Sequence, residues 1–396
     1  MINVRRKKMR LLIHDLNDEE WKEIAGEYEG WKIISDNGTI KPCVGCFGCW
    51  VKEPGQCVIK DGYGKMGALI HAANEVTVIS RYTYGGFGSF VKNVFDRSIG
   101  WVLPYFEVYR DEMHHRKRYP EDKPFTFIFR GSAFTDEDKK KAEAYVDAVC
   151  TNLRGSIKSI RFEETGEQGE NHGIRKEYPA ADPGKIILLN CSLRGNKANS
   201  KKFLDKIAVN LDGNAECINL SSYVGKYDEL ADVLGTAGTI VFGMPLYVDG
   251  IPSAALDVME LLETCSFAEK KNIYAVTNMG LYESRQLKNM MSMIKMWCDK
   301  CGFIYGGGVA IGAGEMMSSV MSATAKGPAK FVTEGLDKLT DAINTASAID
   351  DIYADAYCFP RFLYMLAANS GWPRAGKLNG LKKKDLLRFS DLEIMD

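Results

Sequence analysis

The chain has 396 residues, with 51 lysines and arginines against 52 aspartates and glutamates, so its formal net charge is −1. This balance excludes the generally basic surface on which nucleic-acid binding depends. Hydrophobic residues make up 45% of the chain and charged residues 26%, as in globular proteins, and the length favours two domains. No run of about 18 apolar residues occurs, and the basic start lacks the apolar core of a signal peptide. We therefore expect a cytoplasmic protein that has neither a nucleic acid nor a membrane as a partner.

The first half of the chain alternates short apolar runs with longer, more charged segments. The apolar runs are rich in Ile, Val, Leu and Phe and are bounded by turn residues, which predicts strands. These strands are Met9–His14, Trp31–Ser35, Val76–Ser80, Phe125–Phe129 and Ile157–Phe162. A helix is predicted at Asp136–Asn152, where apolar side chains recur three and four positions apart. A repeated strand-then-helix order indicates a parallel sheet with helices on both faces.

The same order of elements begins again after a polar, glycine-containing stretch at 165–184. The second set of predicted strands is Lys185–Asn190, Glu216–Leu220, Thr239–Gly243, Asn272–Thr277 and Phe303–Gly308. The predicted helices are Ser200–Leu211, Tyr227–Leu234, Pro252–Glu263, Arg285–Lys300 and Pro328–Ser347. This internal repeat of about 180 residues has the size of a duplicated domain. We divide the chain into a domain at 1–164, a linker at 165–184, a domain at 185–350 and a C-terminal extension at 351–396, to which the sequence assigns no chemistry.

A loop of small hydroxyl and amide side chains, Cys191–Ser200 (CSLRGNKANS), follows the first strand of the second half and leads into a helix. Backbone N–H groups at a helix N-terminus and the helix dipole both favour an anion, and no carboxylate in this loop repels one. The spacing matches neither the dinucleotide-binding nor the P-loop pattern, and an ordinary helix-capping turn is the alternative. The candidate phosphate ligands are Ser192, Arg194, Asn199 and Ser200.

Two further loops, Met244–Pro252 and Asn278–Tyr282, follow the next strands that we expect to lie beside the first. Ligands of open α/β sheets bind beyond the carboxyl ends of the strands, where all three loops fall. Tyr247 and Tyr282 offer flat faces for a ring, and a glycine in each loop permits close approach of the backbone.

Together, the segments Ser192–Ser200 and Pro245–Pro252 resemble the NAD(P)H-dependent FMN reductase family, over about Lys185–Ser347. The resemblance implies an α/β protein made of two flavodoxin-like, doubly wound parallel-sheet domains in tandem, each a three-layer α/β/α structure. It implies that the first loop binds the FMN phosphate through the four candidate ligands. It also implies that the flavin ring is lined by Pro245, Leu246, Tyr247 and Val248, and that Asn278, Gly280 and Tyr282 complete the cofactor site.

The first half carries a related pattern at Tyr82–Ser89, followed by a helix that contains Lys92 and an Asp-Arg pair. Its first loop departs from the family pattern, because His14–Glu20 contains four carboxylates in place of hydroxyl groups. A phosphate there would meet like charge. We therefore expect that this half does not bind its own FMN in the usual way, and that the carboxylates serve a helix N-terminus.

Four of the 11 cysteines crowd between residues 43 and 57 (CVGCFGCWVKEPGQC). Thiolates are the ligands of iron–sulfur clusters, and a cubane cluster needs four of them. The spacing resembles that of the iron–sulfur flavoproteins, which join a [4Fe–4S] cluster to a flavodoxin-like FMN domain. Structural or redox-active thiols and a zinc site are the alternatives. The ligands of a cluster would be Cys43, Cys46, Cys49 and Cys57.

The two halves look complementary, because one has the cysteines and the other has the phosphate loop. We expect them to pair as two subunits would, either within one chain as a pseudo-dimer or in a homodimer. The leading hypothesis is an FMN-dependent NAD(P)H oxidoreductase that passes hydride to the flavin and on to a small-molecule acceptor or a redox protein. The alternatives are an electron-transfer module with a [4Fe–4S] cluster and a non-enzymatic binding protein. No catalytic acid or base is predicted, and the basic run Glu112–Tyr119 is expected to be a solvated loop.

Overall fold

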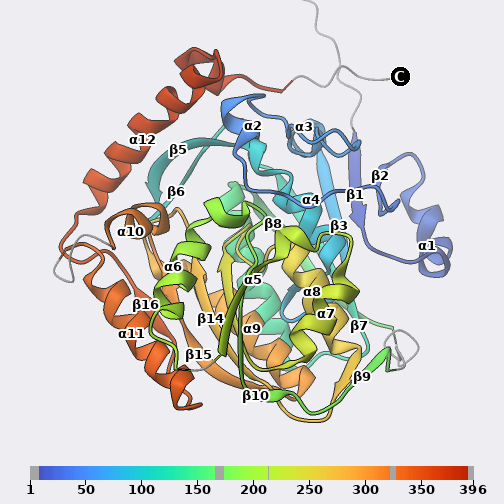
Figure 1. The fold of residues 1–396 in the computed structure, drawn as a ribbon. Coiled ribbons are helices and arrows are strands. Elements are labelled where there is room, and N and C mark those ends of the chain that lie inside the picture. The colour runs from blue at the N-terminus through green and yellow to red at the C-terminus, as the bar shows by residue number, and fades with distance from the viewer. Residues whose placement is uncertain (1–8, 166–173, 213, 322–326, 391–396) are drawn as a thin grey trace, which may run out of the picture.

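Two parallel sheets form the framework of the computed structural model, which describes residues 9–165, 174–212, 214–321 and 327–390 (Figure 1). The first sheet has the order β2-β1-β3-β7-β8, and β4 pairs antiparallel with β3 at its end. Its strands are β1 (Arg10–His14), β2 (Lys32–Ile34), β3 (Glu75–Thr83), β4 (Gly86–Phe87), β7 (Pro124–Gly131) and β8 (Ser156–Glu164).

The second sheet repeats this arrangement and has the order β11-β10-β12-β14-β15-β16, with parallel neighbours throughout. Its strands are β10 (Asp182–Asn190), β11 (Asn214–Asn219), β12 (Ala237–Pro245), β14 (Asn272–Asn278), β15 (Ile304–Ile311) and β16 (Ile352–Ala354). Numbered within its own half, each sheet begins 2-1-3-4-5, which is the flavodoxin-like order, and β16 adds a sixth strand at the edge of the second sheet. The predicted α/β class with two doubly wound parallel sheets is therefore confirmed.

Helices cover the faces of both sheets. In the first half they are α1 (Asp18–Ile24), α2 (Gly48–Val51), α3 (Met66–Ala72), α4 (Ser89–Asp96) and α5 (Asp136–Leu153). In the second half they are α6 (Asn199–Ala208), α7 (Tyr227–Gly235), α8 (Ser253–Glu263), α9 (Lys288–Cys301), α10 (Gly314–Val320) and α11 (Lys330–Asn344). A last helix, α12 (Arg361–Leu378), leads to the 3₁₀ turn η7 (Lys383–Leu387).

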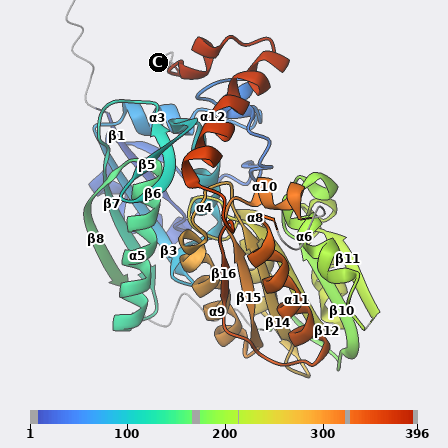
Figure 2. The same cartoon turned by 90° about the vertical axis from the view of Figure 1, so that its left-hand side faces the viewer.

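A hydrophobic core runs through both halves and joins them. Helices α4 and α5 pack against α8 and α9, and Figure 2 shows α4, α8 and α9 between the two sheets. Met293 of α9 lies against Gly86 of the first half and Gly250 of the second, with Tyr145 of α5 beside both glycines. Both positions are tightly packed, since an added Cβ would meet the end of the Met293 side chain at about 3 Å and that side chain would have to shift slightly.

Several segments differ from the prediction. The basic run at 112–119 is not a solvated loop: strand β6 (Glu112–Lys117) pairs with β5 (Val102–Tyr109), and both Met113 and His114 are buried. A short strand, β9 (Lys176–Tyr178), lies within the predicted linker and pairs with β13 (Cys265–Phe267). No helix in the described part of the chain is both long and apolar enough to cross a membrane.

Candidate functional site

A cavity of about 600 Å³ lies at the carboxyl ends of strands β10, β12 and β14. Its walls come from distant parts of the chain: the three predicted loops, the cysteine loop of the first half and helix α12. The predicted cofactor residues that line it are Ser192, Arg194, Asn199, Ser200, Pro245, Leu246, Tyr247, Val248, Asn278 and Gly280. The four predicted metal ligands, Cys43, Cys46, Cys49 and Cys57, line the same cavity.

Tyr282 is the one predicted cofactor residue that does not line the cavity. Its hydroxyl donates a hydrogen bond to the carbonyl oxygen of Phe359, and its ring lies 5.8 Å from that of Tyr364. Both Phe359 and Tyr364 do line the cavity. Tyr282 therefore supports the wall from behind.

The loop after β10 is held in shape by amide side chains. Asn190, the last residue of the strand, donates hydrogen bonds to the carbonyl oxygen of Gly195 at 3.0 Å and to Asn219 Oδ1 at 2.8 Å. The loop ends at α6, whose N-cap residue, Ala198, has no side chain that could cap the helix. The first amides of α6 are therefore available to an anion at the positive end of the helix dipole.

Two of the candidate phosphate ligands are already positioned by neighbours. Ser200 is 1% exposed, and its hydroxyl accepts a hydrogen bond from Asn278 Nδ2 at 2.8 Å. Asn199 Oδ1 accepts a hydrogen bond from Ser318 Oγ at 2.8 Å. Arg194 is exposed, with its guanidinium 5.8 Å from the centre of the Phe47 ring. The loop after β10, the loop after β14 and the cysteine loop thus meet at one end of the cavity.

The loop after β12 turns back tightly on itself. The backbone N–H groups of Tyr247 and Gly250 donate to each other's carbonyl oxygens, and the two residues between them have positive φ angles, 37° at Val248 and 61° at Asp249. A positive φ strains a β-branched residue such as valine, and such strain persists only where the surroundings impose it. The contacts that hold this turn come from the first half of the chain.

Helix α4 supplies those contacts through a buried ion pair. Lys92 and Asp96 pair with each other and are both inaccessible to solvent. Lys92 Nζ also donates to the carbonyl oxygen of Tyr247 at 2.7 Å, while Asp96 Oδ2 accepts from the backbone N–H of Ser253 at 3.1 Å. Burial raises the pKa of Asp96, and Lys92 opposes that shift. The first half thereby fixes the loop of the second half that carries the predicted ring-binding residues.

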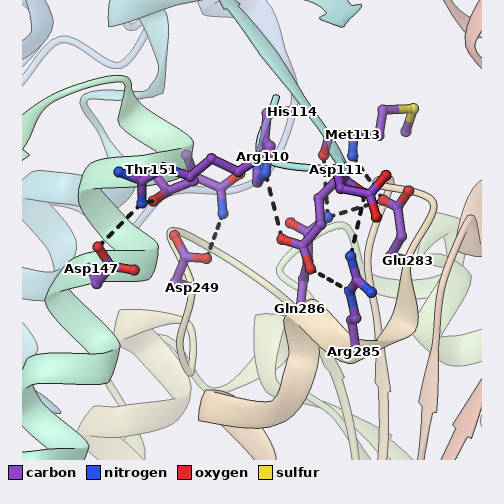
Figure 3. A network of polar contacts seen from close by, with 12 residues as sticks. Arg110, Asp111, Met113, His114, Asp147, Thr151, Asp249, Glu283, Arg285 and Gln286 are labelled. Atoms are coloured by element: carbon purple, nitrogen blue, oxygen red, sulfur yellow. Dashed lines mark hydrogen bonds and ion pairs between the residues drawn. The ribbon is translucent and has the colours of Figure 1, made fainter. Parts of the chain in front are cut away.

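Asp249 begins a polar network that crosses between the halves (Figure 3). It is 2% exposed, and its Oδ1 accepts a hydrogen bond from Asn152 Nδ2 at 2.5 Å. Asn152 Oδ1 in turn lies 2.6 Å from His114 Nδ1, and Glu112 joins His114 to Arg285. Asp249 Oδ2 has no hydrogen-bond partner among the described residues, and burial raises the pKa of the carboxyl to about 7. Asp249 also lines the cavity, a role that sequence reasoning did not assign to it.

The cysteine loop forms a further wall of the cavity, next to Arg194 of the loop after β10. Gly45 has a φ of 64°, and a Cβ added there would lie 2.0 Å from the hydroxyl oxygen of Tyr247. Arg97 of α4 anchors the far end of the loop: its Nε donates to Cys57 Sγ at 3.0 Å, and its guanidinium pairs with Asp61. The loop is therefore packed directly against the ring-binding residues of the second half.

The four cysteines share the cavity without converging on one point. All of them are free thiols, and no group of three or more His, Cys, Asp or Glu side chains in the described ranges is arranged to hold a metal ion. Burial raises the pKa of Cys43 to about 12 and that of Cys49 well above its ordinary value. Both thiols are therefore protonated at neutral pH in this arrangement. The donor atoms suit an iron–sulfur cluster, and the metal-ligand role of these four cysteines stays a prediction.

Aromatic side chains from the cysteine loop and from α12 close the other end of the cavity. Phe47 stacks on Trp50 with ring centres 5.3 Å apart, and Trp372 of α12 meets both rings edge-on. His115 lies 4.6 Å from Trp50, and burial lowers the pKa of its imidazole to about 4, so it is neutral at pH 7. The sequence had assigned no chemistry to α12, although aromatic residues in an otherwise small-residue segment gave a signal.

The matching loop of the first half is closed by its own carboxylate. Asp15 Oδ1 accepts from the backbone N–H of Arg81 at 2.9 Å, and Oδ2 accepts from Ser80 Oγ at 3.0 Å. Asn17 and Glu20 form a capping box at the start of α1. Asp15 thus occupies the carboxyl end of β1, where the second half has its phosphate loop, and the remaining carboxylates lie in the first turn of α1 as expected.

No protein-family model matches the chain, and no curated protein matches its sequence. An azoreductase from Bacillus anthracis str. Sterne is 14% identical, with 41% of this chain and 99% of that one covered at a TM-score of 0.30. An NAD(P)H:quinone oxidoreductase from Methanothermobacter marburgensis is 13% identical. The match covers 49% of this chain and 94% of that one, with a TM-score of 0.24. An FMN-dependent NADH-azoreductase from Bacillus anthracis str. Ames Ancestor, in complex with FMN, is 13% identical. The match covers 49% of this chain and 99% of that one, with a TM-score of 0.21. Likenesses this weak carry no argument about function.

Proposed function

We propose that this chain is an FMN-dependent NAD(P)H oxidoreductase, with the cofactor in the cavity at the carboxyl ends of β10, β12 and β14. Hydride would pass from NAD(P)H to the flavin and then to a small-molecule acceptor or a redox protein. The observation that carries the proposal is the meeting of ten predicted cofactor residues in one cavity. Those residues come from three separate loops, which the parallel topology brings to the edge of the sheet where ligands of such folds bind.

The end of the cavity next to α6 suits a phosphate. The uncapped first turn of α6 offers backbone donors, Ser192 and Ser200 offer buried hydroxyls, and Arg194 offers a positive charge. Asn278 holds the Ser200 hydroxyl in place, so little side-chain freedom is lost when an anion binds. No carboxylate lies in the loop between residues 191 and 200.

The rest of the cavity suits a flat, largely apolar ring. Leu246 and Tyr247 are held by the tight turn after β12, while Phe47 and Trp372 limit the opposite side. FMN would supply the hydride chemistry, and these residues would orient its ring and exclude water from it. Asp249, with its raised pKa and an unpartnered oxygen, is placed to hold a proton near the bound ring.

The site is built by both halves of the chain. The second half supplies the phosphate loop, and the first half supplies Lys92, which fixes the turn, and the cysteine loop, which covers it. This supports an intramolecular pseudo-dimer, because one chain already joins two flavodoxin-like units around one cavity. A homodimer is not needed to complete the site.

The proposal is tested by measuring the FMN affinity of the Arg194→Ala, Ser200→Ala double variant. A hydrogen bond to a charged group contributes about 1.5–3 kcal/mol, so losing two ligands should weaken binding by about a hundredfold or more. Lys197→Ala is the matched control, because it removes an exposed positive charge from the same loop without lining the cavity. Equal FMN affinity of the double variant and the unchanged chain would refute the site.

A second candidate function, electron transfer through a [4Fe–4S] cluster, is favoured by one observation: the four cysteines line the proposed flavin cavity. Anaerobic purification followed by iron and acid-labile sulfide assays separates the two candidates. Iron near four atoms per chain, as a [4Fe–4S] site requires, would support the second. Flavin absorption without iron would mean that the cysteines of this loop are structural or redox-active thiols in the cavity wall.

A further inference from the structure

Helix α12 has two apolar sides. Tyr364, Ala368 and Trp372, spaced four residues apart, face the cavity, where the Tyr364 hydroxyl donates to the carbonyl oxygen of Gly280 at 2.7 Å. The other side of the helix lies at the edge of the molecule, as Figures 1 and 2 show. A globular helix normally has a polar outer side, so the apolar outer side of α12 calls for an explanation.

Exposed apolar side chains are concentrated on this outer side and just beyond it. Six of the fifteen large hydrophobic residues that are exposed in the described part of the chain fall within residues 362–389. Phe362 is 63% exposed, Leu366 is 66% exposed and Leu378 is 89% exposed. These side chains and the basic residues near them are together called the C-terminal face. Its apolar members are Phe362, Leu363, Leu366, Leu378, Leu387 and Phe389.

Basic side chains follow these apolar ones in the second half of α12 and in η7, where Leu378, Leu387 and Phe389 lie among them. Between residues 370 and 390 the only acidic residue is Asp385, which pairs with Arg388 at 3.5 Å. The other cations are exposed and form no ion pair within the ranges that the structure describes; they are Arg374, Lys377, Lys382, Lys383 and Lys384. The chain as a whole is nearly neutral, so positive charge is locally in excess over this stretch.

The C-terminal face is firmly attached to the rest of the protein. Asn369 bonds both backbone groups of Phe106, accepting from its N–H at 2.7 Å and donating to its carbonyl oxygen at 3.0 Å. At the start of α12, Arg361 pairs with Glu283 at 2.8 Å. The buried side chain of Leu386 fixes η7 against Leu103 and Tyr105. The apolar outer side is therefore presented by a fixed element.

We propose that the C-terminal face docks onto an anionic lipid surface. Exposed Phe and Leu side chains beside lysines and arginines are the composition of segments that lie in the membrane interface, where apolar groups enter the lipid and cations meet anionic headgroups. A symmetric contact between two copies would bring the two clusters of positive charge together, which disfavours a second chain as the occupant. The expectation of no membrane partner rested on the lack of a spanning segment, and a surface contact needs none.

Docking in this way links the lipid surface to the cavity. The same helix that would lie on the membrane supplies Trp372 and Ala368 to the cavity wall. The docking itself depends on residues outside the proposed cofactor site, so it stands or fails independently of FMN binding.

The test is co-sedimentation of the full chain with phosphatidylcholine vesicles that contain or lack phosphatidylserine. We expect binding to the anionic vesicles, little binding to the neutral ones, and release by high salt. Phe362→Ser, Leu366→Ser should weaken binding by about tenfold or more. Val209→Ser, Val224→Ser is the matched control, because it removes two exposed apolar side chains from loops and helix ends outside residues 361–390, and it should bind as the unchanged chain does.

Two results would overturn the proposal. Absence of binding to anionic vesicles by the unchanged chain is the first, and equal binding by both double variants is the second. Analytical ultracentrifugation of the same proteins tests the alternative that a second copy of the chain covers the face. If the unchanged chain is a dimer that does not bind vesicles, and the Phe362→Ser, Leu366→Ser variant is a monomer, the face belongs to a second copy. Circular dichroism and FMN affinity should be the same in all variants, which shows that the fold and the cavity are intact.

Discussion

Replacing Asp249 by asparagine should make the stability of the protein less sensitive to pH. The side chain is 2% exposed, and burial raises the pKa of its carboxyl from the ordinary 3.8 to about 7. An asparagine has the same shape and can still accept the hydrogen bond from Asn152. The substitution therefore removes the titration and keeps most of the packing.

The sign and size of the effect follow from the two pKa values. Below about pH 4 the carboxyl is protonated in both the folded and the unfolded chain, and its full contribution to stability is present. As the pH rises to about 7, the unfolded chain ionises while the folded chain keeps the proton, so that contribution is lost. A difference of about 3 pKa units corresponds to about 4 kcal/mol. Relative to the unchanged chain, Asp249→Asn should therefore gain about 4 kcal/mol between about pH 4 and pH 8.

The assay is urea unfolding of the flavin-free full chain, followed by circular dichroism across this pH range. Asp147→Asn is the matched control, because Asp147 lies on the adjacent helix α5 with 62% of its side chain exposed. Its pH dependence should follow that of the unchanged chain. If the unfolding free energies of Asp249→Asn and the unchanged chain run parallel with pH, the carboxyl does not titrate as its burial requires, and the reasoning fails.

Three more substitutions test how the halves are joined and capped. Lys92→Met should cost about 3–5 kcal/mol, measured as a lower melting temperature by calorimetry, because it leaves Asp96 buried without its cation. Gly45→Ala should speed labelling of the cysteine loop by a thiol reagent, since the added Cβ would lie 2.0 Å from the Tyr247 hydroxyl. Thr135→Ala should cost about 1 kcal/mol in urea unfolding through loss of the α5 cap, and Thr135→Ser should restore it.

Each of these has a contrary outcome. An unchanged melting temperature in Lys92→Met would mean that the ion pair does not hold the turn after β12. Unaltered labelling rates in Gly45→Ala would show that the cysteine loop is not packed against Tyr247. Equal urea midpoints for Thr135→Ala and Thr135→Ser would mean that the capping box does not contribute to the stability of α5.

The framework of the fold was accessible from the sequence because its strands are apolar and regularly spaced. Strand β12 and helix α8 were placed within two residues of their observed ends. The cavity end that faces α6 was also predictable, since loops after neighbouring parallel strands must converge at one edge of the sheet. The meeting of Ser200 with Asn278 is a direct consequence of that topology.

The remaining parts of the site depend on contacts that no local pattern encodes. Helix α12 is apolar on both sides, so it lacks the single hydrophobic stripe by which a surface helix is recognised. His114 sits in a polar, basic run, yet it is buried because β6 packs against α5, where its Nδ1 lies 2.6 Å from Asn152 Oδ1. The raised pKa of Asp249 likewise arises from burial between the halves, which composition and spacing do not show.

Titration of FMN into the flavin-free full chain, with the stoichiometry read by isothermal titration calorimetry, tests the central claim most directly. The proposed phosphate loop belongs to the second half and lines the cavity, and Asp15 closes the corresponding loop of the first half. We predict that one FMN binds per chain and that Arg194→Ala, Ser200→Ala abolishes or strongly weakens that binding. Two FMN molecules per chain, or none, would contradict the proposed site and the division of labour between the halves.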